Sequence, residues 1–270
     1  MAWGCFCWIP CPYKKWNEDD RQAMLNMFPL VGLLLAIVIA AAWVILDLIH
    51  APWLISGILL SALYFMMTGF IHLDGFMDVS DAIMSRRPQL EERQRILKDS
   101  NVGAFAVISV IIMSLIFVGS MMNIVQIHSP VICGIIAVIL MSSRAMSAIC
   151  VISCPPMSKS QYHEMIVTKA AAIPAFVIMI LVIAAGAVCF IVLWPDSIFD
   201  FPGGNPDIWI AGPSNSPFVR YVVPVGVTIA VSWLVGAVDR KSLGGMNGDI
   251  SGHMITLSEM AGIAALALVA

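Results

Sequence analysis

The sequence predicts an all-α, polytopic integral membrane protein, a helical bundle in which residues 1–270 form a single membrane domain. Hydrophobic residues make up 60% of the chain and charged residues only 11%, whereas soluble domains average about 45–50% and about 25%. So few charges cannot give a soluble globule of this size a polar surface. The net charge of −3 also lacks the basic excess of a nucleic-acid-binding protein.

Seven apolar segments predict about seven transmembrane helices, since a helix needs about 20 apolar residues to cross the hydrocarbon layer. They are residues 28–49, 51–71, 102–124, 130–152, 171–194, 219–238 and 254–270. Only a short turn separates the first two, so we expect a helical hairpin there. The last segment is short and carries Glu259, which leaves six or eight spans as alternatives.

The basic residues predict the orientation of these spans. All Lys and Arg except Arg144 and Arg220 lie before the first span or in the second, fourth and sixth connections. Short cytoplasmic loops are enriched in Lys and Arg. This alternation therefore predicts a cytoplasmic N-terminus and supports the count of spans, because a missed helix would disrupt it.

The second connection, residues 72–101, is the longest on the basic side and is the predicted catalytic segment. Its stretch PQLEERQRILKDSNVG predicts a short amphipathic helix along the inner interface. Asp74, Asp78 and Asp81 precede it at positions i, i+4 and i+7, which stacks them on one helical face.

Three carboxylates on one face repel one another, so a positive partner is expected. Mg²⁺ suits such a site, because it binds one or two carboxylates and completes its shell with water and substrate phosphate. Arg86 and Arg87 are the alternative partners. A solvated polar loop with helix-capping aspartates is the remaining interpretation.

The same connection holds further candidates. Arg95 and Lys98 are suited to holding a phosphate, and Asp99 is suited equally to capping the next helix and to binding metal. His72 is either a base or a simple hydrogen-bond donor at a helix end.

A glycine-rich cytoplasmic loop is predicted at residues 239–253. Gly244, Gly245 and Gly248 would let backbone amides cradle a phosphate, and Asp249 is the acid that the loop presents. The alternative is an interhelical loop without a ligand.

Arg144 and Glu259 are charged residues that lie well inside predicted spans. Arg144 must reach the interface or pair, and an acidic metal site with anionic substrates would be a suitable partner. Glu259 is protonated, hydrogen-bonded to a neighbouring helix, or directed toward the inner-face site. Because all these groups face one compartment, they favour phosphoryl or nucleotidyl transfer over transport, which would place ionisable groups at mid-membrane.

The segments GFIHLDGFMDVSDA, RILKDSNVGAFAV and LGGMNGDISG resemble the signature blocks of the cobalamin synthase family, the adenosylcobinamide-GDP ribazoletransferases. The IPCP and SSRAM segments resemble the same family, so the similarity runs nearly end to end. Two positions depart from it: Asn247 stands where the family usually has Thr, and His253 where it has a small residue.

The resemblance implies a Mg²⁺-dependent enzyme of a prokaryotic plasma (inner) membrane, with its active site in the cytoplasm. Its substrates would be adenosylcobinamide-GDP and α-ribazole or its 5′-phosphate, and GMP would be released. The lipid bilayer is an expected partner, and the sequence leaves a homo-oligomer open.

Motif position and the chemistry of the residues together predict three sets of site residues. The predicted catalytic residues are His72, Asp74, Asp78, Asp81 and Asp99. The predicted phosphate-binding residues are Arg95, Lys98, Arg144, Gly244, Gly245 and Gly248. The predicted metal ligands are Asp74, Asp78, Asp81 and Asp249.

Two other functions compete with this one. CDP-alcohol lipid phosphotransferases also place spaced aspartates on inner-leaflet helices, but their DG-x₂-AR motif has no match here. A cation transporter would use the same aspartates as a route, although their place beside five bases disfavours conduction.

Overall fold

The structure is a computed structural model, and it describes residues 1–11, 17, 20–127, 130–158, 160, 162, 168–193 and 217–269. These residues form helices and connecting turns, with no strand among them, so the predicted all-α fold is confirmed. The helices are α1 (Ala2–Phe6), α2 (Arg21–Asn26), α3 (Phe28–Leu48), α4 (Trp53–Met67), α5 (Ile71–Met84), α6 (Leu90–Ile96), α7 (Ala104–Val125), α8 (Pro130–Ser153), the 3-10 turn η2 (Lys169–Ala172), α9 (Ile173–Leu193), α11 (Pro217–Leu243) and α12 (Gly248–Val269).

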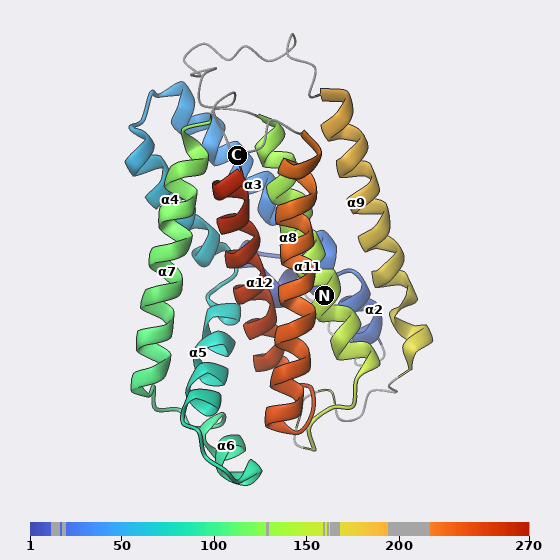
Figure 1. The fold of residues 1–270 in the computed structure, drawn as a ribbon. Helices are drawn as coiled ribbons and strands as arrows, with labels where there is room; N and C mark the ends of the chain where they lie inside the picture. The colour runs from blue at the N-terminus through green and yellow to red at the C-terminus, as the bar shows by residue number, and fades with distance from the viewer. Residues whose placement is uncertain are drawn as a thin grey trace.

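Helix α8 is the centre of the bundle (Figure 1). Within its apolar stretch 83% of the residues are buried, against 17% in the stretch that contains η2 and α9. Helices α3, α9, α11 and α12 all contact α8. Helix α9 is therefore a peripheral helix with most of its apolar surface directed outward, as expected for a helix that faces lipid.

Glycines allow the closest helix contacts. A Cβ atom on Gly32 of α3 would lie 2.5 Å from the carbonyl oxygen of Leu140 in α8. One on Gly57 of α4 would lie 2.6 Å from Cα of Met122 in α7. Small residues at such crossings let two backbones approach, which is how helices associate where no hydrophobic effect drives them together.

Among the described residues, six helices are long and apolar enough to cross a membrane, and the bent pair α4–α5 makes a seventh span if it crosses as one. The predicted continuous span at residues 51–71 is wrong, because α4 ends at Met67 and α5 leaves it at an angle of 85°. Gly69 and Phe70 both adopt positive φ, at 59° and 61°, which ends the helix. Helix α4 alone is about 22 Å long, shorter than the hydrocarbon layer of about 30 Å.

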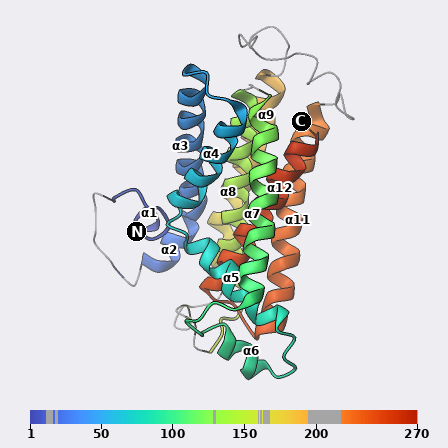
Figure 2. The same ribbon diagram turned by 90° about the vertical axis from the view of Figure 1, so that its left-hand side faces the viewer.

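This break lets α5, the helix that carries the acidic residues, pack against α7 and α12. Figures 1 and 2 show α5 continuing beyond α4 along the side of α7. Helix α5 contacts both α7 and α12. The first part of the predicted cytoplasmic connection 72–101 is thus a packed helix, and only the part from Ser85 onward is a connection with the short amphipathic helix α6. A short helix was predicted here, and it is confirmed as seven residues, while its place along the inner interface stays a prediction.

The predicted glycine-rich loop 239–253 is also much shorter than expected. Helix α11 continues to Leu243 and α12 already begins at Gly248. The two helices therefore leave only residues 244–247 between them, and Asp249 lies in the first turn of a helix.

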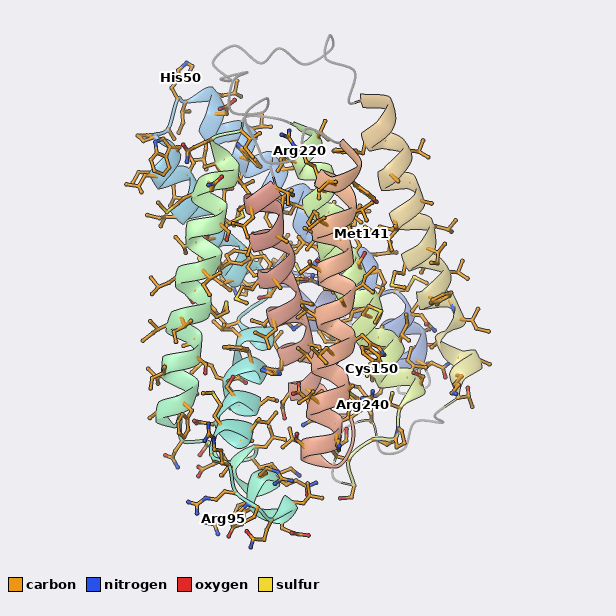
Figure 3. All side chains as sticks on the ribbon, in the orientation of Figure 1. His50, Arg95, Met141, Cys150, Arg220 and Arg240 are labelled. Atoms are coloured by element: carbon orange, nitrogen blue, oxygen red, sulfur yellow. The ribbon has the colours of Figure 1, made fainter. Side chains whose placement is uncertain are left out.

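Basic residues lie in the last turn of α6 (Arg93 and Arg95) and in the last turn of α11 (Arg240 and Lys241). Arg95 and Arg240 lie toward one end, and His50 and Arg220 toward the other (Figure 3). Helix α6 is joined to the basic end of α11, because Gln94 donates a hydrogen bond of 2.8 Å to the carbonyl oxygen of Leu243. We call the end that carries α6 the basic end.

Candidate active site

The acidic face of α5 meets the beginning of α12 near the basic end. A Cβ atom on Gly75 would lie 2.8 Å from the carbonyl oxygen of Asp249 and 2.9 Å from its Cα. One turn later in α12, a Cβ atom on Gly252 would lie 3.0 Å from the carbonyl oxygen of His72. Glycine on each helix therefore allows a backbone crossing that brings Asp249 beside the α5 acids.

Four carboxylates interact electrostatically at this crossing. The charges of Asp74, Asp249 and Asp81 all act on Asp78, which is partly buried. Asp74 is exposed, and the carboxylates of Asp74 and Asp78 form no hydrogen bond with the other described residues. The structure thus brings together the two acidic stretches on which the predicted site depends, while the roles of their residues stay predictions.

Asp81 is already engaged as a helix cap. Its Oδ2 accepts a hydrogen bond of 2.5 Å from the amide of Gly103, and its Oδ1 accepts one of 3.0 Å from the amide of Ala106. These are amides of the first turn of α7, which have no partner within their own helix. The structure therefore gives Asp81 the capping role that was the alternative to metal binding.

Replacing Gly103 with Ala is expected to destabilise the protein by about 1–3 kcal/mol. The added Cβ would lie 2.2 Å from Oδ2 of Asp81, so the cap must shift. Gly134→Ala is the matched control, because its Cβ would have no neighbour within 4 Å. Thermal unfolding in one detergent measures the stability of both variants. Equal melting temperatures for Gly103→Ala and Gly134→Ala would contradict the capping role of Asp81.

Asn247 begins α12 and orients Asp249. Its Oδ1 accepts a hydrogen bond of 2.9 Å from the amide of Ile250, which is a helix N-cap. Its Nδ2 donates a hydrogen bond of 2.7 Å to Oδ2 of Asp249. The departure from Thr at this position therefore keeps the capping oxygen and adds an amide donor, which leaves the other oxygen of Asp249 for a ligand.

Of the bases in the 72–101 segment, Lys98 is the one whose charge acts on Asp249. Lys98 is exposed, in the turn that follows α6. The neighbouring Asp99 accepts hydrogen bonds from the amide (3.0 Å) and the side chain (2.7 Å) of Asn101. These bonds hold the pKa of Asp99 below its usual range, with the nearby charge of Arg95 adding to the effect. Asp99 and Arg95 are thus exposed residues beside one another.

The glycines after α11 reverse the direction of the chain, and the amides of two of them are already hydrogen-bonded within the protein. The amides of Gly244 and Gly245 both donate to the carbonyl oxygen of Arg240, at 2.9 and 3.1 Å. Gly244 has φ +82°, and a Cβ atom on Gly245 would lie 2.7 Å from the amide nitrogen of Met157. This geometry therefore does not support the predicted phosphate cradle at Gly244 and Gly245, whose role stays a prediction. Gly248, the first residue of α12, keeps the position in which a helix N-terminus favours an anion.

Arg144 and Glu259 form a buried ion pair. Arg144 Nη1 pairs with Glu259 Oε1, and both side chains are 0% exposed. The hydroxyls of Tyr64 and Ser143 also donate to the Glu259 carboxylate. Glu259 is thus hydrogen-bonded to neighbouring helices, one of the three predicted alternatives. The prediction that Arg144 binds substrate phosphate finds no support, because the pair is closed off inside the bundle.

His72 also lies apart from the acids. Its ring packs against Phe6 and Phe28, with centroid distances of 6.3 and 5.8 Å. Two residues of helix turn it about 200° away from Asp74, and its Nε2 is buried without a hydrogen-bond partner among the described residues. The geometry therefore does not support His72 as the base of a reaction at the acidic face.

Sequence reasoning missed a buried pair beside this site. Asp239 Oδ2 and His253 Nδ1 are 2.6 Å apart, linking α11 to α12. The ring of His253 stacks on Phe76, at 5.3 Å between centroids. No local signal pairs residues from two helices, and the sequence marked His253 only as a departure from a family pattern. The larger side chain fills space between α5, α11 and α12.

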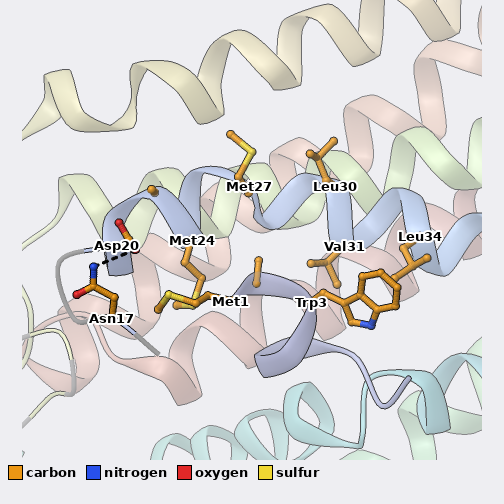
Figure 4. Close-up of a pocket in the computed structure, with 11 residues that line it drawn as sticks. Met1, Trp3, Asn17, Asp20, Met24, Met27, Leu30, Val31 and Leu34 are labelled. Carbon is orange, nitrogen blue, oxygen red and sulfur yellow. Dashed lines mark hydrogen bonds between the residues drawn. The ribbon is translucent and has the colours of Figure 1, made fainter. Parts of the chain in front are cut away.

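A cavity of about 800 Å³ lies elsewhere, between the N-terminal segment and α3. Figure 4 shows its mostly apolar lining, with Asn17 donating a hydrogen bond of 3.1 Å to Asp20. Its described lining residues include none from α5 or α12. This cavity is therefore separate from the acidic residues.

The described residues contain no group of three or more His, Cys, Asp or Glu side chains gathered tightly enough to hold a metal by themselves. Mg²⁺ does not require one, since it binds through one or two carboxylates and completes its shell with waters and substrate phosphates. That chemistry fits the carboxylates of Asp74 and Asp78, which accept no hydrogen bond from the other described residues, and the unengaged oxygen of Asp249.

The chain is similar to known proteins along nearly its whole length. It matches the family described as cobalamin-5-phosphate synthase over residues 1–267. A protein of Clostridium botulinum (strain Alaska E43) is 31% identical over 264 residues, which cover 97% of this chain and 94% of the relative. One of Clostridium perfringens (strain SM101) is 26% identical over 269 residues, which cover 100% and 96%. Both relatives are named adenosylcobinamide-GDP ribazoletransferase. No solved structure matches the chain.

Proposed function

The chain belongs to the cobalamin-5-phosphate synthase family and joins ribazole to adenosylcobinamide-GDP, and we propose that the acids at the α5–α12 crossing carry out this transfer with Mg²⁺. The observation that carries the proposal is the contact of Gly75 with the backbone of Asp249, which unites acids from two distant parts of the chain.

In the proposed reaction a hydroxyl oxygen of ribazole, or of its 5′-phosphate, attacks the cobinamide-linked phosphorus of the diphosphate. A new P–O bond forms, the bond to the bridging oxygen of GMP breaks, and the hydroxyl proton must be accepted. Asp74 and Asp249 would hold Mg²⁺, with Asp78 beside them. When bound, the metal supplies charge neutralisation for the diphosphate and for the departing GMP.

The protein residues supply the remaining parts. Asp78 is the proposed acceptor of the hydroxyl proton, since it lies partly buried among the acids and its carboxylate forms no hydrogen bond with the other described residues. Lys98 would bind a phosphate oxygen, because its charge already acts on Asp249. The amide of Gly248 at the start of α12 would favour the same anion.

We also propose that the basic end, and with it the site, faces the cytoplasm of a prokaryotic plasma membrane. Its support is the gathering of Lys and Arg in the connections at that end, the bias typical of cytoplasmic loops.

GMP release from adenosylcobinamide-GDP is expected to require both Mg²⁺ and ribazole. Chelating divalent cations with EDTA should reduce release to background, and added Mg²⁺ should restore it. Release that persists at the original rate in EDTA would contradict the metal. CMP release from a CDP-alcohol, or cation uptake into vesicles without GMP release, would favour the two competing functions.

A further inference from the structure

A basic pocket lies where the end of α5, α6 and the last turn of α11 meet. It has a volume of about 530 Å³, and its lining includes Arg86, Arg87, Arg93 and Lys241 with the apolar residues Ile83 and Val238. No acidic residue is among its described lining residues, and the exposed Glu91 and Glu92 of α6 do not take part. Four positive charges around one pocket favour the binding of an anion.

Hydrogen bonds of the Arg93 side chain hold the walls of this pocket together. Its Nε donates a hydrogen bond of 2.8 Å to the carbonyl oxygen of Ser242, at the end of α11. Its Nη1 donates to the carbonyl oxygens of Arg87 (2.6 Å) and Pro88 (3.1 Å), after α5. One guanidinium thus ties all three segments together, so the pocket is preformed.

The pocket faces away from the acidic site. Ile83 lies nine residues after Asp74, or about two and a half turns, which puts the two side chains on opposite sides of α5. An anion bound beside Ile83 is therefore not the diphosphate held by the α5 acids.

One wall of the pocket continues into surface that faces outward from the bundle. Val238 is 48% exposed, and Leu234, one turn earlier on the same side of α11, is 56% exposed. In a membrane-spanning helix such exposed apolar side chains contact lipid tails. The surface is therefore apolar along the helix and strongly basic at its end.

We propose that this pocket binds the headgroup of an anionic glycerophospholipid, with the acyl chains lying along Val238 and Leu234. The phosphate diester would be held by the four bases, as in other basic pockets between transmembrane helices. A free phosphate would satisfy the bases but would leave the adjoining apolar wall without a partner, which favours the lipid. This site is independent of the proposed function, because it depends only on the helices at the basic end.

The test is native mass spectrometry of the full chain, delipidated in a neutral detergent and titrated with phosphatidylglycerol or phosphatidylcholine. Phosphatidylglycerol is expected to bind more tightly than phosphatidylcholine. Lys241→Gln and Arg86→Gln should each weaken its binding about fivefold. Lys169→Gln, which removes an exposed base outside the pocket, should leave it unchanged.

Equal binding of the two lipids, or unchanged phosphatidylglycerol binding in both pocket variants, would overturn the proposal. So would variants that retain lipid but raise KM for adenosylcobinamide-GDP, because the pocket would then serve the soluble substrate. Both substitutions are at exposed side chains, so folded protein is expected for each, and either one suffices if the other unfolds.

Discussion

Asp74→Asn is expected to lower kcat by at least about 100-fold, the loss seen when a group that stabilises charge in a transition state is removed. The substitution keeps the shape of the side chain and removes the charge that would hold Mg²⁺. The Asp74 side chain is exposed and its carboxylate forms no hydrogen bond with the other described residues, so the fold should be unaffected. GMP release measured at saturating substrates, together with the melting temperature, separates these two effects.

Two acids serve as controls for this substitution. Glu92→Gln removes an exposed carboxylate from α6 and should leave kcat unchanged. Asp81→Asn should mainly lower the melting temperature, because Asp81 caps α7. A wild-type kcat in Asp74→Asn would refute the role of Asp74, and so would an equal loss of kcat in Glu92→Gln.

Arg144→Met and Glu259→Leu are each expected to destabilise the protein by about 3–5 kcal/mol, since each leaves a buried charge without its partner. Both side chains are 0% exposed, and the pair lies in the interior of a membrane bundle. No water is available there to solvate an unpaired charge. The melting temperature in one detergent, or the fraction of folded protein recovered, measures the loss.

The double variant Arg144→Met/Glu259→Leu should be more stable than either single variant. Removing both charges leaves apolar side chains in place of an ion pair, an exchange that is often close to neutral. Tyr64 loses its acceptor in this variant, so full recovery is not expected. Additive losses from the two single substitutions would show that the pair is not coupled.

Hydropathy predicted most of the fold, because a membrane span depends on composition over about 20 residues and little else. The broken span between α4 and α5 escaped this reasoning. Its apolar residues run on without interruption, and the break depends on positive φ at Gly69 and Phe70. Backbone conformation at a non-glycine residue such as Phe70 is set by packing, which sequence composition does not record.

The candidate site was predictable in part. The i, i+4, i+7 spacing placed Asp74 and Asp78 on one face, and the glycine block pointed to Asp249. Which carboxylates are already engaged was not predictable, because the Asp81 cap and the Arg144–Glu259 pair join residues far apart in the chain. The same holds for Asp239 and His253, whose contact depends on how α11 and α12 pack.

Acids of α5 and α12 are proposed to hold one metal ion together, and binding of Mn²⁺ in place of Mg²⁺ tests this most directly. Mn²⁺ suits the same carboxylate and water ligands, and electron paramagnetic resonance measures how much of it is bound in the presence of adenosylcobinamide-GDP without ribazole. Asp74→Asn and Asp249→Asn are each predicted to weaken Mn²⁺ binding, whereas Glu92→Gln retains it. Wild-type Mn²⁺ affinity in both aspartate variants would contradict a metal site shared by α5 and α12.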